Sequence, residues 1–187
     1  ENASNNARSQ VIEVTYREPD LSIANLTAPD TAHSGEPITL SWTVDNIGSR
    51  DTRVGAWSDA VYLSTDASLD PGDVRLGSVA HTTGLAMGSS YSGTGEVTLP
   101  VGIGGDYYLL LVTDDGDAVK EFAAEANNML ARLITVSLSA PPDLKVTQVQ
   151  PQAHATTSQF FDFSYTVANV GGGDVPPTQG TWTDLFY

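Results

Sequence analysis

An internal repeat constrains the fold of this chain more than any other feature of its sequence. The segment 42–48 reads Trp-Thr-Val-Asp-Asn-Ile-Gly, and 165–171 reads Tyr-Thr-Val-Ala-Asn-Val-Gly, 123 positions later. The triplet Pro-Asp-Leu at 19–21 recurs with the same offset at 142–144. Self-similarity over such a period indicates one structural unit that is used more than once.

Two further matches set the predicted boundaries of the repeats. The Trp-x-Asp motif at 57–62 recurs at 182–187 with an offset of 125, so two residues are inserted in the Gly/Pro-rich loop before it. Insertions of this kind are tolerated in loops. The segment 11–14 aligns with 133–136 at an offset of 122, and each is preceded by an Asn-Asn pair. We therefore expect the closing strand of a preceding repeat (1–18), a complete repeat (19–140) and the N-terminal part of a following repeat (141–187).

The hydrophobic pattern predicts strands throughout. In the segment 38–45, apolar and polar residues alternate with a period of two, and 161–168 repeats the pattern. This period is typical of strands with one face in a core and the other in water. About seven such strands in a unit of roughly 120 residues predict an all-β fold of immunoglobulin-like β-sandwiches in tandem. Only the stretch 118–126 is compatible with a helix, of one or two turns.

Composition excludes several classes of function. The chain has 23 Asp and Glu against 8 Lys and Arg, a net charge of -15, which repels nucleic acid. It has no Cys, so disulfides, thiolate metal sites and thiol nucleophiles are absent. The longest apolar block, 107–112, has the length of a strand and is far shorter than a membrane span. His33, His81 and His154 are isolated from any nucleophile motif, so we expect no enzymatic activity.

These motifs together resemble CARDB, the cell-adhesion-related domain of bacteria. The shared features are Pro-Asp-Leu at 19–21, the Trp-Thr-Val-x-Asn-x-Gly motif at 42–48, Trp-x-Asp-x-x-Tyr-Leu-Ser-x-Asp at 57–66, Asp-Pro-Gly-Asp at 70–73, Tyr-Tyr-Leu at 107–109, and Glu121 with Glu-Ala-Asn-Asn at 125–128. The resemblance implies a non-catalytic module, usually in tandem within large secreted or surface proteins. It implies an extracellular or cell-surface location. The implied partners are neighbouring repeats, copies of the chain itself, or a cell-surface or matrix ligand.

The best candidate for a metal site is the acidic loop that contains Asp66, Asp70 and Asp73. Three carboxylates lie within a segment of eight residues that contains a Pro-Gly turn. Carboxylate oxygens are ligands of the kind that calcium prefers. The alternative is that these side chains bind their own backbone in turns and face solvent. The spacing does not follow the EF-hand pattern, so both interpretations stand at this point.

Two other acidic positions are weaker candidates. Glu121 and Glu125 share a face if their stretch is helical, and either bind a metal, contact the next repeat or form a solvated face. Asp59 lies on the apolar face of its strand, where a carboxylate is costly unless it is hydrogen-bonded. Because Asp184 repeats this position, we expect a structural hydrogen bond at Asp59 and no catalytic role.

The leading functional hypothesis is a structural and adhesive repeat whose proline-containing linkers restrict bending. The alternative is a filament-forming subunit that assembles by strand donation. In that case the tail of one copy adds a strand to the incomplete sandwich of another copy. The apolar face of the tail consists of Ile12, Val14 and Tyr16, and it would contact Phe161, Phe163 and Tyr165. A weaker alternative, from fold analogy alone, is a carbohydrate-binding accessory domain.

Overall fold

The computed structural model describes residues 8–122, 124–154, 156–175 and 180–186. Within these ranges the chain forms strands and a short 3-10 turn, without an α-helix, which confirms the all-β prediction. The elements are β1 (Leu21–Thr27), β2 (Thr31–His33), β3 (Pro37–Asn46), β4 (Trp57–Ser64), β5 (Val74–His81), β6 (Ser90–Thr98), β7 (Gly105–Val112), the 3-10 turn η2 (Glu125–Asn127), β8 (Met129–Ser137), β9 (Leu144–Pro151) and β10 (Phe163–Asn169). The Asn pair at 5–6 and the last residue of the repeated motif, Tyr187, lie outside the described residues.

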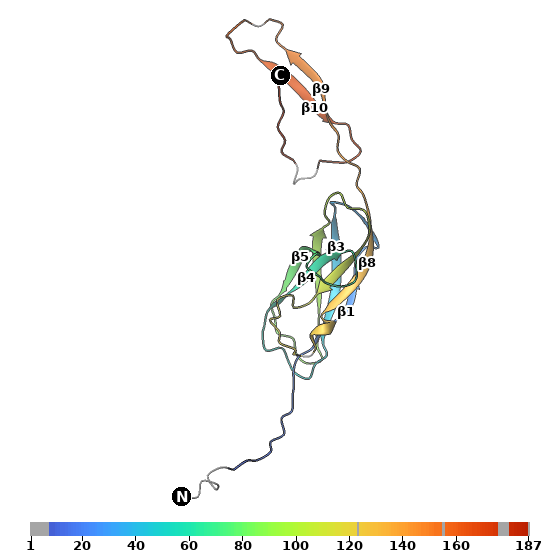
Figure 1. The fold of residues 1–187 in the computed structure, drawn as a ribbon, viewed down its shortest axis with the longest axis vertical. Coiled ribbons are helices and arrows are strands. Elements are labelled where there is room, and N and C mark those ends of the chain that lie inside the picture. Colours follow the sequence, from blue (N-terminus) through green and yellow to red (C-terminus); the bar gives the residue numbers. More distant parts are fainter. Residues whose placement is uncertain (1–7, 123, 155, 176–179, 187) are drawn as a thin grey trace. The chain divides into compact units, whose positions relative to one another are not determined.

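The strands form three sheets (Figure 1). One sheet has the order β1-β3-β6, the second has the order β2-β8-β7-β4-β5, and β9 pairs with β10 alone. The first two sheets bury apolar side chains on one face each, which is the arrangement of a β-sandwich. Strand β7 lies between β8 and β4 and is therefore an interior strand of its sheet.

By its contacts, the chain divides into two compact units. The first comprises residues up to Ala28, Thr39–Val97 and Tyr108–Arg132; the second comprises Pro29–Ile38, Thr98–Tyr107 and the residues from Leu133 onward. Strands β3, β6, β7 and β8 each contribute residues to both units.

The core of the first unit follows the predicted alternation. In β3, Leu40, Trp42 and Val44 are buried while Ser41 is exposed. Strand β7 supplies Leu109, Leu110 and Leu111, all fully buried because sheet neighbours and packed side chains cover both of its faces. Trp42 and Trp57 are also buried, which confirms that both indoles are core anchors.

The second unit contains the end of the sandwich and the β9–β10 hairpin. Strand β2 pairs in parallel with β8, with Thr31 opposite Thr135, and Ile134 and Val136 are buried. Strands β9 and β10 are antiparallel, with Leu144 opposite Asn169. Their apolar side chains are largely exposed, so this sheet has no core of its own among the described residues.

The predicted helical stretch at 118–126 is not helical. The structure has a 3-10 turn only at Glu125–Asn127, and Phe122 has a positive φ of 59° that interrupts any helix before it. No helix in the described part of the chain has the length and apolar character needed to cross a membrane.

Candidate functional site

The most connected polar group in the first unit is the carboxylate of Asp59, on β4. It is 2% exposed and accepts hydrogen bonds from Trp42 Nε1 at 2.8 Å and from Thr113 Oγ1 at 2.8 Å. The hydroxyl of Tyr91 contacts both carboxylate oxygens, at 2.9 and 2.8 Å. We call these four residues the Asp59 network. Three donors from separate parts of the chain offset the cost of burying this charge.

The partners of Asp59 come from β3, from β6 and from the residue that follows β7. The indole of Trp57 donates to Tyr91 Oη at 3.1 Å and extends the network. Burial, followed by the charge of Asp59, raises the pKa of Tyr91, so its hydroxyl remains a donor. Every hydrogen bond to this buried carboxylate comes from a side chain that ties one part of the core to another, and this geometry indicates a structural role.

A second buried polar group, the Asn46 side chain at the end of β3, organises the loop that follows. Its Oδ1 accepts from the amides of Asp20 and Gly48, both at 3.1 Å. Its Nδ2 donates to the carbonyls of Arg50 at 2.8 Å and Leu85 at 3.1 Å. We call Asp20, Asn46 and Gly48 the Asn46 elbow, because the side-chain amide of Asn46 fixes the positions at which the chain enters β1 and leaves β3.

The same contacts recur in the second unit, around Asn169. Its Oδ1 accepts from the amides of Asp143 at 2.9 Å and Gly171 at 3.1 Å, and its Nδ2 donates to the carbonyl of Gly173 at 2.7 Å. Tyr165 donates to Asp184 at 2.8 Å, as Trp42 does to Asp59 in the first unit. Asn46 and Asn169 are 123 positions apart, as are the equivalent residues that contact them, and Asp59 and Asp184 are 125 positions apart. These are the offsets of the repeated motifs.

Glycine at 48 and 171 is required by close backbone approach. A Cβ at Gly48 would lie 2.5 Å from the carbonyl oxygen of Glu18 and 2.6 Å from the amide of Asp20. A Cβ at Gly171 would lie 2.5 Å from the carbonyl oxygen of Pro141. The repeated Asn-x-Gly spacing therefore has the same steric cause in both places.

Near the start of β1, a group of acidic and amide side chains gathers around Glu121. We call Asp20, Glu121, Glu125, Asn127 and Asn128 the Glu121 cluster. Glu121 is 2% exposed, and neither of its carboxylate oxygens has a hydrogen-bond partner of normal geometry among the described residues. The expectation of a solvated face is therefore wrong for Glu121, because the non-helical loop turns this side chain inward.

The electrostatics of Glu121 follow from its burial, which raises the pKa of its carboxyl to about 8. The nearby amide of Leu21 opposes this rise, and so does the side chain of Asn128, more weakly. The carboxylates of Glu125 and Asp20 add to the rise. Glu125 is exposed, and its Oε1 accepts from the Glu121 amide at 3.2 Å, so the two residues meet without a helix.

The loop that leads into this cluster has an unusual backbone. Asp114, Asp117 and Phe122 all have positive φ, at 50°, 51° and 59°. Asp114 holds the loop by accepting from the amides of Ala118 at 2.9 Å and Val119 at 2.7 Å. Such a conformation is uncommon for residues other than Gly, so the local sequence gave little indication of it.

The predicted calcium loop forms side-chain turns. Asp66 Oδ1 accepts from the Ser68 amide at 2.8 Å, Asp70 Oδ1 from the Gly72 amide at 2.6 Å, and Asp73 Oδ2 from the Asp70 amide at 2.8 Å. In the described part of the chain, no group of three or more His, Cys, Asp or Glu side chains is arranged to hold a metal ion. Calcium binding by this loop stays a prediction, since carboxylates can exchange backbone partners for an ion.

The structure places the predicted strand-donation residues on exposed surfaces. In the first unit, Ile12, Val14 and Tyr16 are 76%, 76% and 61% exposed and belong to no strand. In the second unit, Phe163 and Tyr165 lie on β10 and Phe161 precedes it, all exposed.

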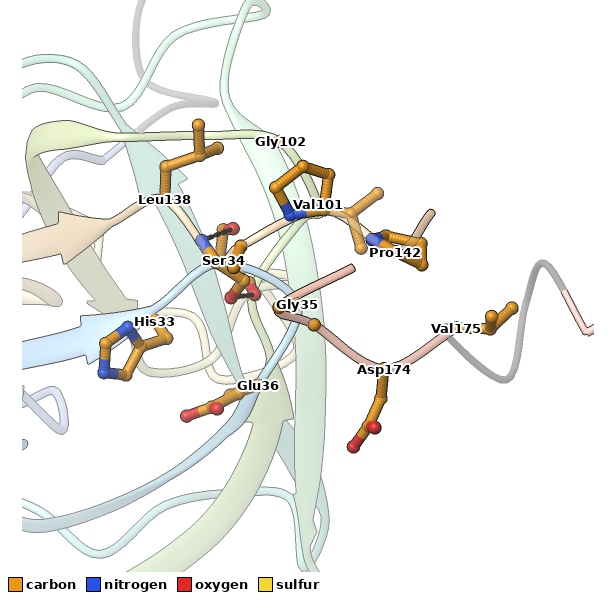
Figure 2. Close-up of a pocket in the computed structure, with 15 residues that line it drawn as sticks. His33, Ser34, Gly35, Glu36, Val101, Gly102, Leu138, Pro142, Asp174 and Val175 are labelled. Atoms are coloured by element: carbon orange, nitrogen blue, oxygen red, sulfur yellow. Dashed lines mark hydrogen bonds between the residues drawn. The ribbon is translucent and has the colours of Figure 1, made fainter. Parts of the chain in front are cut away.

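A pocket in the second unit has Ser34, Gly35 and Val101 among its lining residues (Figure 2). Ser34 Oγ accepts from the Ser139 amide at 3.0 Å, and Ser139 Oγ donates to the Ser34 carbonyl at 2.6 Å. Both serines are engaged in fastening the chain where it leaves β8.

The two packed sheets define the class of an immunoglobulin-like β-sandwich. The profile of the CARDB family matches residues 18–132, more than half of the chain. The chain belongs to the CARDB family, a non-enzymatic, adhesion-related family of bacterial domains, which confirms the resemblance over this range.

Solved structures with a similar fold include a CARDB domain from Pyrococcus furiosus, determined by crystallography in complex with di-metal ions. It is 18% identical, the match covers 70% of this chain and 99% of that one, and the TM-score is 0.49. A β-glucosidase from Listeria innocua in complex with glucose is 18% identical, with 65% of this chain and 16% of that chain covered and a TM-score of 0.41. No curated protein sequence matches this chain.

Proposed function

We propose that this chain is part of a tandem array of CARDB sandwiches with a structural and adhesive role in a bacterial extracellular or surface protein. The observation that carries the proposal is the recurrence of the Asn46 elbow around Asn169. The amide contacts of Asn46 with Asp20 and Gly48 have direct equivalents at Asp143 and Gly171. Independent segments rarely acquire the same set of contacts at a constant sequence offset.

In this proposal, residues 1–18 belong to a preceding repeat, 19–140 form the complete repeat, and 141–187 begin the next. Each sandwich is a stiff unit, and Pro19, Pro141 and Pro142 restrict rotation where units join. The array then acts as a spacer that presents a cell-surface or matrix contact away from its anchor.

Small-angle scattering of the natural polypeptide tests this proposal. We expect a rod-like profile whose length grows in proportion to the number of repeats. A profile of a freely jointed coil would contradict the stiff-array model. A variant with Gly-Ser in place of Pro141 and Pro142 serves as the matched control, and we expect it to scatter as a more flexible chain.

Strand donation is the second candidate, favoured by the exposed apolar rows of the tail and of β9–β10. In this case Ile12, Val14 and Tyr16 of one copy pair with the β9–β10 sheet of another. Native mass spectrometry of the purified chain should then find oligomers that Ile12→Asp together with Val14→Asp dissociates. Val11→Asp is the matched control, because Val11 is 95% exposed but lies on the opposite parity of the tail. A chain that is monomeric at all concentrations excludes this candidate.

A further inference from the structure

The carboxylate of Glu121 is buried beside the amide of Leu21 and the side chain of Asn128, which both oppose the rise of its pKa without forming a hydrogen bond of normal geometry. Its two oxygens and Asn128 Oδ1 are all buried without a hydrogen-bond partner of normal geometry among the described residues. Glu121 is 2% exposed and Asn128 is 6% exposed. Such groups are rare in native proteins, because each carries the full cost of desolvation unless a proton, a water molecule or an ion satisfies it.

The charges around Glu121 increase this cost. Both charged groups that act on it, Glu125 and Asp20, are carboxylates. Two basic side chains of the first unit are engaged elsewhere: Arg53 forms an ion pair with Glu18, and Lys120 forms one with Asp117. Negative charge is therefore concentrated around a desolvated carboxylate.

The orientation of the two Asn side chains is fixed by the same carboxylates. Asn128 Nδ2 donates to Glu125 Oε2 at 3.1 Å, and Asn127 Nδ2 donates to Asp20 Oδ1 at 2.8 Å. With both nitrogens engaged, the oxygens Oδ1 of Asn127 and Asn128 are left buried without a partner. The unsatisfied atoms of the cluster are thus all oxygens, and oxygens are the ligands of hard cations.

We propose that the Glu121 cluster binds a hard divalent cation of the calcium type, with the Glu121 carboxylate and Asn128 Oδ1 as its protein ligands. Glu125 is exposed at the edge of the cluster, where a carboxylate oxygen and water complete the coordination. The ion joins the loop at 114–128 to the start of β1. This inference does not depend on the tandem arrangement.

Calorimetric titration and thermal melting of the whole chain, freed of metal with EDTA and then given calcium chloride, test the proposal. We expect saturable binding and a rise of several degrees in the melting temperature, because an ion that binds only the folded state stabilises it. Glu121→Gln keeps the shape of the side chain and removes its charge, so this variant should lose both responses. Glu125→Gln should weaken the affinity at least tenfold and serves where Glu121→Gln does not fold.

The matched control is the triple variant Asp66→Asn, Asp70→Asn, Asp73→Asn, which removes the other acidic group. We expect this variant to retain the calcium response in full. Two results overturn the proposal: identical melting of the wild type in calcium and in EDTA, or a response that persists in Glu121→Gln and disappears in the triple variant. The second result assigns the ion to the loop at 66–73.

Discussion

The indole of Trp42 donates a hydrogen bond of 2.8 Å to the buried carboxylate of Asp59, and this bond joins the two sheets of the sandwich. Trp42 lies on β3 in the three-stranded sheet, and Asp59 lies on β4 in the five-stranded sheet. A directional bond between the sheets fixes their mutual position in a way that apolar packing alone does not.

Replacement of Asp59 should therefore destabilise the protein strongly. Asp59→Leu leaves the donors of Trp42, Tyr91 and Thr113 without an acceptor, and we expect a loss of about 3–5 kcal/mol in the free energy of unfolding. Urea denaturation followed by tryptophan fluorescence measures it. Asp45→Asn on β3 is the control and should change stability by less than about 0.5 kcal/mol. A loss for Asp59→Leu as small as that of the control contradicts the structural role.

The Asn46 elbow predicts a second sensitive position. Asn46→Ala removes four hydrogen bonds, to the amides of Asp20 and Gly48 and to the carbonyls of Arg50 and Leu85, and leaves buried backbone groups unpaired. We expect a loss of about 2–4 kcal/mol, measured by chemical denaturation. Asn25→Ala, which removes only an exposed side-chain bond, should be close to neutral. If Asn46→Ala were as close to neutral as Asn25→Ala, the elbow would contribute nothing to the free energy of unfolding.

Gly93, in β6, has a steric role that predicts a third effect. A Cβ at Gly93 would overlap the indole ring of Trp42, whereas a Cβ at Gly116 meets nothing within 4 Å. Gly93→Ala should lower the melting temperature by roughly 5–15 °C, because Trp42 must leave its position in the core. Gly116→Ala, the matched control, should leave it nearly unchanged. Normal melting of Gly93→Ala contradicts the packing of Trp42 against β6.

The sequence contains enough information to predict the strands of the sandwich but not its polar contacts. Alternation at Leu40, Trp42 and Val44 predicts β3 because the period of two is a local property of the chain. The repeat also marks Asn46 and Asp59 as special, since both recur. The partners of Asp59 are not local: Tyr91 lies 32 positions away, and nothing in its own neighbourhood indicates the contact.

Glu121 is the clearest case in which local reasoning fails. The spacing of Glu121 and Glu125 predicts a shared helical face in solvent, but positive φ at Phe122 turns the backbone out of any helix. The side chain is then buried near Leu21, a hundred positions earlier in the chain. A position of this kind depends on the tertiary fold, so no periodicity in its own segment reveals it.

The raised pKa of Glu121 predicts a specific dependence of stability on pH in metal-free solution. Its pKa is about 8 in the folded protein against 4.5 for the ordinary group, so between these values the folded state binds a proton that the unfolded state has lost. The free energy of unfolding therefore falls as the pH rises from about 4.5 to 8, with a slope of at most about 1.4 kcal/mol per pH unit from this group. Beyond pH 8 this contribution levels off.

Urea denaturation in EDTA at a series of pH values, for the wild type and for Glu121→Gln, isolates this effect. The two proteins share all other titratable groups, so the difference between their free energies of unfolding reports Glu121 alone. We expect the free energy of unfolding of Glu121→Gln, relative to that of the wild type, to rise steadily between pH 5 and 8, because Gln has no proton to lose. A difference that stays constant over this range would mean that the carboxylate is already ionised in the folded protein. Its charge would then need a compensating group even without metal.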